Sequence, residues 1–160
     1  MISKKIFSLI TLAILTILFT GLVSASILDS TGFDPEKSIS IEKTEFNIPD
    51  GYVKNDSKSI VNETKTVGND SYILNQETFQ NNNSDEITFS IIKFNNMDVD
   101  ADTLDRICEG VDNKTLRGYP GYICDYGNYT NFTYAFNNRA VTISAPNEEL
   151  INQVLVVEDA

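Results

Sequence analysis

Apolar and polar residues alternate most clearly in the middle of the chain, where two β-rich segments flank a polar stretch. The segments are 72–80 and 86–94, and the stretch between them, 81–85, consists of Asn, Ser and Asp. In the second segment the apolar residues point to one side of an extended chain and the polar residues to the other, as in a half-buried strand. The apolar members are Ile87, Phe89 and Ile91, and the polar members are Thr88 and Ser90. This pattern predicts a central β-hairpin.

Shorter segments of the same kind lie on both sides of the hairpin. They predict strands at 44–48, 58–62, 115–117, 122–126, 132–136 and 141–145. Turn residues separate them, and we predict turns at 49–51, 118–121 and 137–138. Most connections are short, which favours antiparallel neighbours.

Two helices complete the expected fold. Residues 100–109 have Leu104, Ile107 and Cys108 on one face, acidic residues that can cap the start, and Gly110 after the end. A second helix is predicted to begin at 146–149. Its apolar stripe is Leu150, Ile151, Val154 and Leu155. The fold class is therefore α+β: a single antiparallel twisted β-sheet of about six or seven strands, with two short helices packed on one face.

The N-terminus has the layout of an export signal. Lys4 and Lys5 precede an uncharged apolar run, 6–23, and the run ends in Val-Ser-Ala at 23–25. This layout predicts a signal peptide at 1–25, cleaved after Ala25. The alternative is an uncleaved membrane anchor, which would be the chain's sole membrane contact. We expect a flexible tether at 26–43 and one α+β domain at 44–160.

Charge narrows the set of partners. The chain carries a net charge of −11, and without Lys4 and Lys5 ten basic residues would face 23 acidic ones, a net charge of −13. Such a surface repels phosphates, so we expect no nucleic acid partner. Protein or cell-surface polymer contacts are the expectation.

Few of the residue types used in catalysis and metal binding are present in the chain. The sequence has no His, which removes the commonest acid–base residue and most zinc and iron sites. The sequence contains no recognisable catalytic motif, so we expect no enzymatic activity. In an exported chain Cys108 and Cys124 are predicted to pair as a disulfide, with a two-sulfur metal site as the alternative.

One acidic run resembles a calcium-binding loop. Asp98, Asp100, Asp102 and Glu109 occupy positions 1, 3, 5 and 12 of an EF-hand-type spacing. Thr103, however, stands where the sharp turn of that loop requires Gly. The competing interpretation is a strand-to-helix loop whose carboxylates complement the helix dipole. Calcium is thus a candidate cofactor, and none is otherwise expected.

Seven sequons make the chain a candidate glycoprotein. They lie at Asn55, Asn62, Asn69, Asn82, Asn113, Asn128 and Asn131. Aromatic residues are frequent between 119 and 136, and two arrangements are open for them: a binding platform, or a core in which they pair across strands. Alternation favours the core for Tyr122, Tyr126, Phe132, Tyr134 and Phe136. Tyr119 and Tyr129 are expected in loops.

Two segments carry a family resemblance. Residues 46–52, Phe-Asn-Ile-Pro-Asp-Gly-Tyr, resemble the opening of small secreted proteins of methanogenic archaea, and residues 118–122, Gly-Tyr-Pro-Gly-Tyr, continue the likeness. The similarity covers about 44–157, and the order of elements is similar to that of PsbP-like α+β sandwiches. Many such domains have Trp where this chain has Tyr52. The resemblance implies an extracytoplasmic protein and transfers no functional residue.

The expected function is therefore that of a non-enzymatic secreted or cell-envelope protein acting through protein or surface-polymer contacts. The alternative is an extracytoplasmic calcium- or ligand-binding module that uses the acidic loop at 98–109. A third possibility is a hydrolase that depends on carboxylates.

Overall fold

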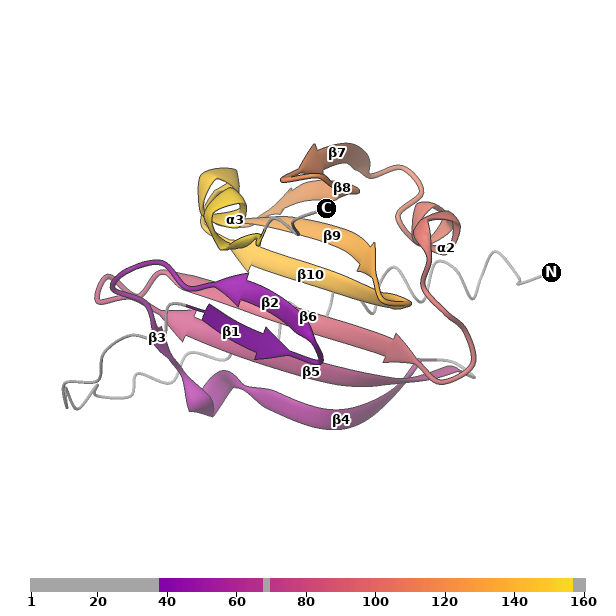
Figure 1. The fold of residues 1–160 in the computed structure, drawn as a ribbon, viewed down its shortest axis with the longest axis horizontal. Coiled ribbons are helices and arrows are strands. Elements are labelled where there is room, and N and C mark those ends of the chain that lie inside the picture. Colours follow the sequence, from indigo (N-terminus) through magenta and orange to yellow (C-terminus); the bar gives the residue numbers. More distant parts are fainter. Residues whose placement is uncertain (1–37, 68–69, 157–160) are drawn as a thin grey trace.

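The computed structural model describes residues 38–67 and 70–156 (Figure 1). The predicted signal peptide, residues 26–37 of the predicted tether, and the sequon at Asn69 lie outside the described residues. The described part is an α+β fold, which confirms the predicted class.

An eight-stranded antiparallel sheet forms the centre of the molecule. Its order is β3-β5-β6-β10-β9-β8-β7, and β4 also pairs with β5. The strands are β3 (Val53–Lys54), β4 (Ile60–Val67), β5 (Asp70–Gln80), β6 (Glu86–Phe94), β7 (Asp112–Leu116), β8 (Tyr119–Tyr126), β9 (Tyr129–Phe136) and β10 (Arg139–Ala145). The predicted central hairpin is present as β5 and β6, paired from Tyr72–Phe94 to Gln80–Glu86. The strand predicted at 58–62 begins later and runs longer, because a short 3-10 helix, η1 (Asp56–Lys58), precedes it.

A separate two-stranded hairpin covers part of this sheet. It consists of β1 (Ser38–Ile41) and β2 (Thr44–Asn47). Phe46 of β2 is completely buried and stacks on Phe89 with ring centroids 4.4 Å apart. The predicted tether boundary is therefore wrong for residues 38–43, because 38–41 pair with β2 and 42–43 form the turn between the two strands.

Both faces of the sheet carry a hydrophobic core, and each helix covers a different face. On one side Ile151 and Val154 of α3 (Glu148–Val154) join Phe46 and the inward residues of β6, β9 and β10. On the other side Leu104 and Ile107 of α2 (Ala101–Ile107) pack against β5, β6 and β10. The prediction that both helices share one face is wrong. Residues such as Leu74, Ile92 and Phe94 make the second face apolar as well, so that face also needs cover.

Side-chain caps set the start of both helices, and the cap of the first was predicted from the sequence. Asp100 accepts a hydrogen bond from the Thr103 N–H at 2.8 Å. Asn147 accepts one from the Leu150 N–H at 2.9 Å. Each bond satisfies a backbone donor that the first helical turn leaves unpaired. Gly110, with φ of 88°, follows the end of α2.

Two of the three predicted turns are confirmed. The Tyr52 N–H donates to the Pro49 carbonyl at 3.2 Å, and the turn at 137–138 joins β9 to β10. The turn predicted at 118–121 is wrong: the chain reverses at Arg117 and Gly118, whose φ angles are 51° and 90°, and residues 119–121 already belong to β8. Positive φ at both central residues is the geometry of a two-residue hairpin.

The aromatic residues divide between the two faces and the surface. Phe132 and Tyr134 are buried in the core beneath α3, as predicted. Tyr126 is 45% exposed, so the prediction that it faces the core is wrong. Tyr119, expected in a loop, lies in β8 and packs on Tyr134 with ring centroids 4.8 Å apart. Tyr129, also expected in a loop, begins β9.

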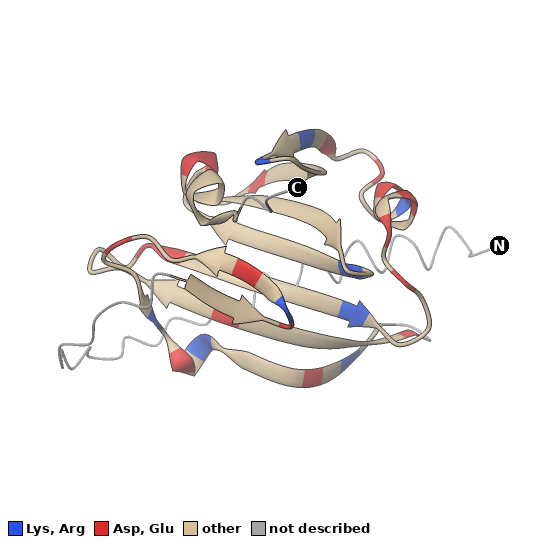
Figure 2. Cartoon of the chain, in the orientation of Figure 1, with Lys and Arg blue, Asp and Glu red and all other residues tan. Residues whose placement is uncertain are grey.

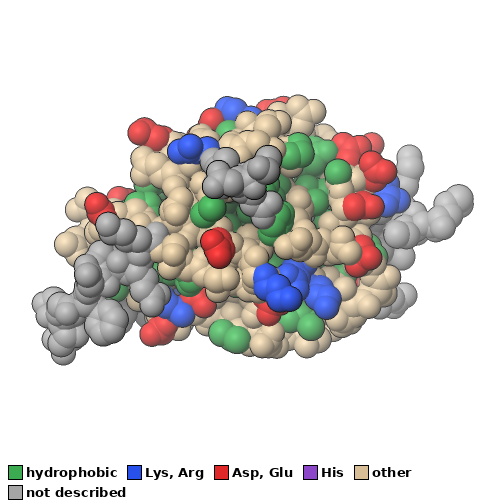
Figure 3. Space-filling view, in the orientation of Figure 1, with side chains coloured by type: hydrophobic (Ala, Val, Ile, Leu, Met, Phe, Trp, Pro, Cys, Tyr) green, Lys and Arg blue, Asp and Glu red, His purple; other side chains and the backbone are tan. Residues whose placement is uncertain are grey.

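Charged residues are spread over the described fold. Figure 2 shows acidic positions on both helices, a basic position on α2, and positions of both signs on several strands. Figure 3 shows acidic and basic side chains scattered over one face. Several are paired, including Lys54 with Glu77 at 2.6 Å and Arg139 with Glu42 at 3.1 Å. This distribution does not form a single charged docking face on the side shown.

Candidate binding groove

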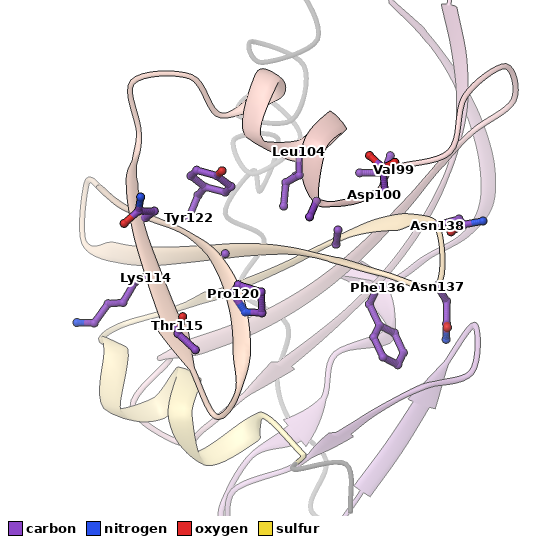
Figure 4. A pocket seen from close by; sticks show the side chains of 14 residues that line it. Val99, Asp100, Leu104, Lys114, Thr115, Pro120, Tyr122, Phe136, Asn137 and Asn138 are labelled. Carbon is purple, nitrogen blue, oxygen red and sulfur yellow. The ribbon is translucent and has the colours of Figure 1, made fainter. Parts of the chain in front are cut away.

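A groove of about 600 Å³ lies between α2 and the strands β7, β8 and β9 (Figure 4). The strands contribute Asn113, Thr115, Pro120, Tyr122 and Ala135. The opposite wall consists of Val99, Asp100, Ala101 and Leu104. The turn at 137–138 closes one end. The volume falls within the range of about 300–1,000 Å³ that is typical of small-molecule sites.

The strand residues in the groove share one face because of their register. Asn113 of β7 lies opposite Tyr122 of β8, and Thr115 lies opposite Pro120. Lys114, between them in sequence, points to the other face and pairs with Glu148 of α3 at 2.6 Å. Figure 4 shows its side chain directed away from the groove. Lys114 is itself one of the residues that line the groove, but its ammonium group is engaged by Glu148. β7 therefore offers the groove an amide and a hydroxyl, and no unpaired ammonium group.

The groove forms where two neighbouring strands separate. β8 pairs with β9 as far as Gly121, whose partner is Tyr134, and the pairing goes no further toward the start of β8. The preceding residue, Pro120, still pairs with Thr115 on its β7 side. Because proline has no backbone N–H, it cannot complete the ladder with β9.

The missing hydrogen bond leaves a backbone acceptor at the groove. The two-residue turn at 137–138 has φ angles of 50° and 61°, so the residues that flank it form the first hydrogen-bonded pair of that hairpin. Alternation along β9 then directs the Ala135 N–H and C=O toward β8. Since Pro120 offers no N–H, the Ala135 carbonyl has no ladder partner at this position.

Tyr122 links β8 to α2 at the side of the groove. Its hydroxyl donates a hydrogen bond to Asp105 Oδ1 at 2.6 Å, and its ring packs against the core that contains Leu104. The hydrogen bond to Asp105 raises the pKa of Tyr122 to about 12, with burial as a further cause. Tyr122 is therefore a neutral hydrogen-bond donor with a fixed partner at neutral pH.

The four residues of the predicted calcium loop do not form a metal site. Asp100 caps α2, and Asp102 lies within the helix. Within 38–67 and 70–156, no three His, Cys, Asp or Glu side chains lie close enough together to hold a metal ion. The calcium prediction with Asp98, Asp100, Asp102 and Glu109 is thus wrong. The physical reason is that 101–107 is helical where an EF-hand loop must curl around the ion.

The Asp100 cap predicts a specific pH dependence. Hydrogen bonds from the Thr103 hydroxyl and backbone N–H lower the pKa of Asp100 below its ordinary value of 3.8. A lowered pKa in the folded state means that the ionised carboxylate stabilises the fold above pH 3.8, and that this contribution is lost as the pH falls through the folded pKa. We expect wild type to have a higher melting temperature than Asp100→Asn at pH 7, with a smaller difference at pH 3.

Thermal unfolding of both proteins across this pH range measures the effect. Asp102→Asn is the control, since Asp102 is exposed and does not cap the helix. A difference between wild type and Asp100→Asn that stays constant from pH 7 to pH 3 would contradict the assigned role of the carboxylate.

The predicted disulfide is not formed. Cys108 and Cys124 are both free thiols, with Cys108 buried and Cys124 half-buried. Burial raises the pKa of Cys108 to about 12, and the nearby Cys124 adds to this shift. Burial also raises the pKa of Cys124. Both side chains are therefore protonated at neutral pH, and Cys108 packs as an apolar residue in the core beneath α2.

The sequons differ in how accessible they are. Those at Asn62, Asn82, Asn113 and Asn128 are exposed. Asn55 is half-buried and its side chain bonds the Ser57 N–H and Gln80. Asn131 is only 4% exposed, within β9, so it is wrong as a glycan attachment site in this fold. Asn113 is notable because a glycan on it would occupy the groove.

Comparison with protein families, curated proteins and solved structures finds no match for this chain. Within the described residues, no helix is long and apolar enough to cross a membrane.

The sequence alone did not indicate this groove. Of its lining residues, Asp100 was a candidate metal ligand and Asn113 a candidate glycosylation site, whereas Thr115 and Pro120 were assigned no role at a site. A signal was nevertheless present: a proline inside a segment rich in β-formers marks a break in strand pairing. What the sequence did not show is which strand would lie beside that proline.

Proposed function

We propose that this chain is a non-enzymatic secreted or cell-envelope protein that holds a protein or surface polymer in the groove between α2 and β7–β9. The observation that carries the proposal is the groove itself: a cavity of about 600 Å³, lined mainly by neutral polar and apolar residues, with Asp100 and Lys114 as its charged members. Export rests on the signal-like segment 1–25, with its basic start and small-residue end.

The protonation states in the groove favour binding over catalysis. A general acid or base works best with a pKa near the operating pH. Asp100 has a lowered pKa and engages Thr103, while the pKa of Tyr122 is raised to about 12. Neither group is suited to transfer protons near neutral pH. Together with the absence of His from the whole sequence, this supports a binding role.

A blocked groove provides the test. Thr115 is exposed and lines the groove, so Thr115→Trp should fill it without disturbing the core. Thr64→Trp is the matched control, because Thr64 is also an exposed strand threonine but lies on β4, away from the groove. Each protein is recovered from cells that export it, immobilised, and exposed to protein and polysaccharide fractions of cell envelopes.

We expect wild type and Thr64→Trp to retain the same component, and Thr115→Trp to lose it. Equal retention by all three proteins would show that the groove is not the contact surface. Finding the expressed chain in the cytosol with Met1 still attached would contradict the extracytoplasmic part of the proposal.

A further inference from the structure

We infer that the ligand of the groove is an uncharged carbohydrate chain, held by polar groups on both walls and by the Ala135 carbonyl. This inference rests on the proposed function and adds the ligand's chemical class.

The charge of the groove disfavours an anionic ligand. Lys114 lines the groove, but its side chain is directed away from it and its ammonium group pairs with Glu148, so β7 offers no unpaired cation. Asp100, on the opposite wall, is ionised because its pKa is lowered. The chain as a whole has a net charge of −11. A polyanion would therefore meet repulsion without a counter-charge, whereas a neutral polymer would not.

The hydrogen-bonding groups suit hydroxyls. The Asn113 amide both donates and accepts, the Thr115 hydroxyl does the same, and the Asp100 carboxylate and Ala135 carbonyl accept. A sugar hydroxyl can also donate and accept, so it can satisfy any of these groups. Because the donors and acceptors come from β7, β9 and the start of α2, a ligand that bridges the groove would meet them from both sides.

Between these polar groups lie apolar surfaces. The Tyr122 ring, held in place by its bond to Asp105, lies beside Leu104, and Pro120 faces the same cavity. The C–H faces of sugar rings pack against aromatic and aliphatic surfaces of this kind. Ala135, with only a methyl group, leaves room over β9.

The backbone of β9 argues against insertion of an extended peptide between β8 and β9. Adding a strand requires a row of unpaired N–H and C=O groups. β9 is paired with β10 over residues 130–136 on one side and with β8 from Gly121 onward on the other. Pro120 leaves a single free carbonyl, at Ala135, which suits one hydroxyl donor but cannot support a strand.

Substitution of Pro120 tests the inference directly. Pro120→Ala supplies the missing N–H, which would bond the Ala135 carbonyl, remove the free acceptor and draw β8 toward β9. The ladder gains a bond, so the variant should fold at least as stably as wild type. Pro49→Ala, which removes a proline from a turn outside the groove, is the control.

Binding is measured by NMR chemical-shift titration of the exported protein. The probes are cellohexaose and N-acetylchitohexaose as neutral sugars, oligogalacturonate as the anionic sugar, and a short alternating Val/Thr peptide. We expect a neutral sugar to shift resonances of Asn113, Thr115 and Ala135, and Pro120→Ala to raise its Kd about three- to tenfold, the equivalent of one hydrogen bond. Thr115→Trp should abolish these shifts, while Pro49→Ala should bind as wild type does.

The outcomes separate the two proposals. Groove binding of the peptide or the anionic sugar in place of the neutral ones would overturn the ligand class and leave the proposed function standing. A neutral sugar bound equally by wild type and Pro120→Ala would overturn the role of the Ala135 carbonyl, and with it the inference as stated. No groove shift with any probe, together with equal retention of envelope components by Thr115→Trp, would overturn both. Protein with a glycan on Asn113 should not bind.

Discussion

Replacing Phe46 with alanine should lower the free energy of unfolding by about 3–5 kcal/mol, the usual cost of removing a buried phenylalanine ring. Phe46 is completely buried, stacks on Phe89, and forms a β-bridge with Leu155 just after α3. It therefore joins the β1–β2 hairpin, the sheet and the C-terminal helix. The loss is a large part of the roughly 5–15 kcal/mol that stabilises a typical domain.

Urea unfolding followed by circular dichroism measures this loss. Glu45→Ala is the matched control, because Glu45 is the neighbouring residue of the same strand and is exposed. Its effect should stay within about 0.5 kcal/mol. Equal midpoints for Phe46→Ala and Glu45→Ala would mean that β2 is not part of the cooperative fold and that the flexible tether extends beyond residue 43.

Gly121→Ala should destabilise the protein by about 1–3 kcal/mol, the range for adding a methyl group to a packed site. A Cβ at this position would lie 2.5 Å from the Thr133 carbonyl oxygen and 2.8 Å from two ring carbons of Phe132. The contact with backbone cannot be relieved by a change of rotamer, so β8 must move away from β9. Gly121 is the first residue of β8 that pairs with β9, and it lies beside the groove.

A double-mutant cycle isolates the cause of that loss. Phe132→Leu removes the ring that the new methyl group would meet, so the double variant should lose less stability than the sum of the two single variants. Urea unfolding of wild type, both single variants and the double variant completes the cycle. Strict additivity would indicate that the Phe132 ring is not the obstacle, and an unchanged midpoint for Gly121→Ala would contradict the close contact itself.

Features set by neighbours in the chain were accessible from the sequence. The β5–β6 hairpin follows from alternation over 72–94 and from the polar residues at its turn, and both are local patterns. The Asp100 cap depends on an N–H three residues away, and the turn at 137–138 on residues that tolerate positive φ. In each case the physical cause lies within a few residues.

Features that depend on contacts between segments far apart in the chain could not be predicted from local sequence patterns. A period of two assigns residues to faces, but it does not say what covers each face, and here α2 and α3 cover opposite sides. Spacing along the chain likewise did not reveal that Cys108 and Cys124 stay unbonded, or that the acidic residues at 98–109 are held apart by a helix.

The groove shows the same division most clearly. Proline at 120 is visible in the sequence, and its lack of an N–H is a property of that residue alone. Its consequence, a free carbonyl at Ala135, requires β9 to lie beside β8, and the cavity also requires α2 to stand over both strands. Local sequence thus determines which hydrogen bond is impossible, whereas long-range packing determines which acceptor is left without it and what surrounds that acceptor.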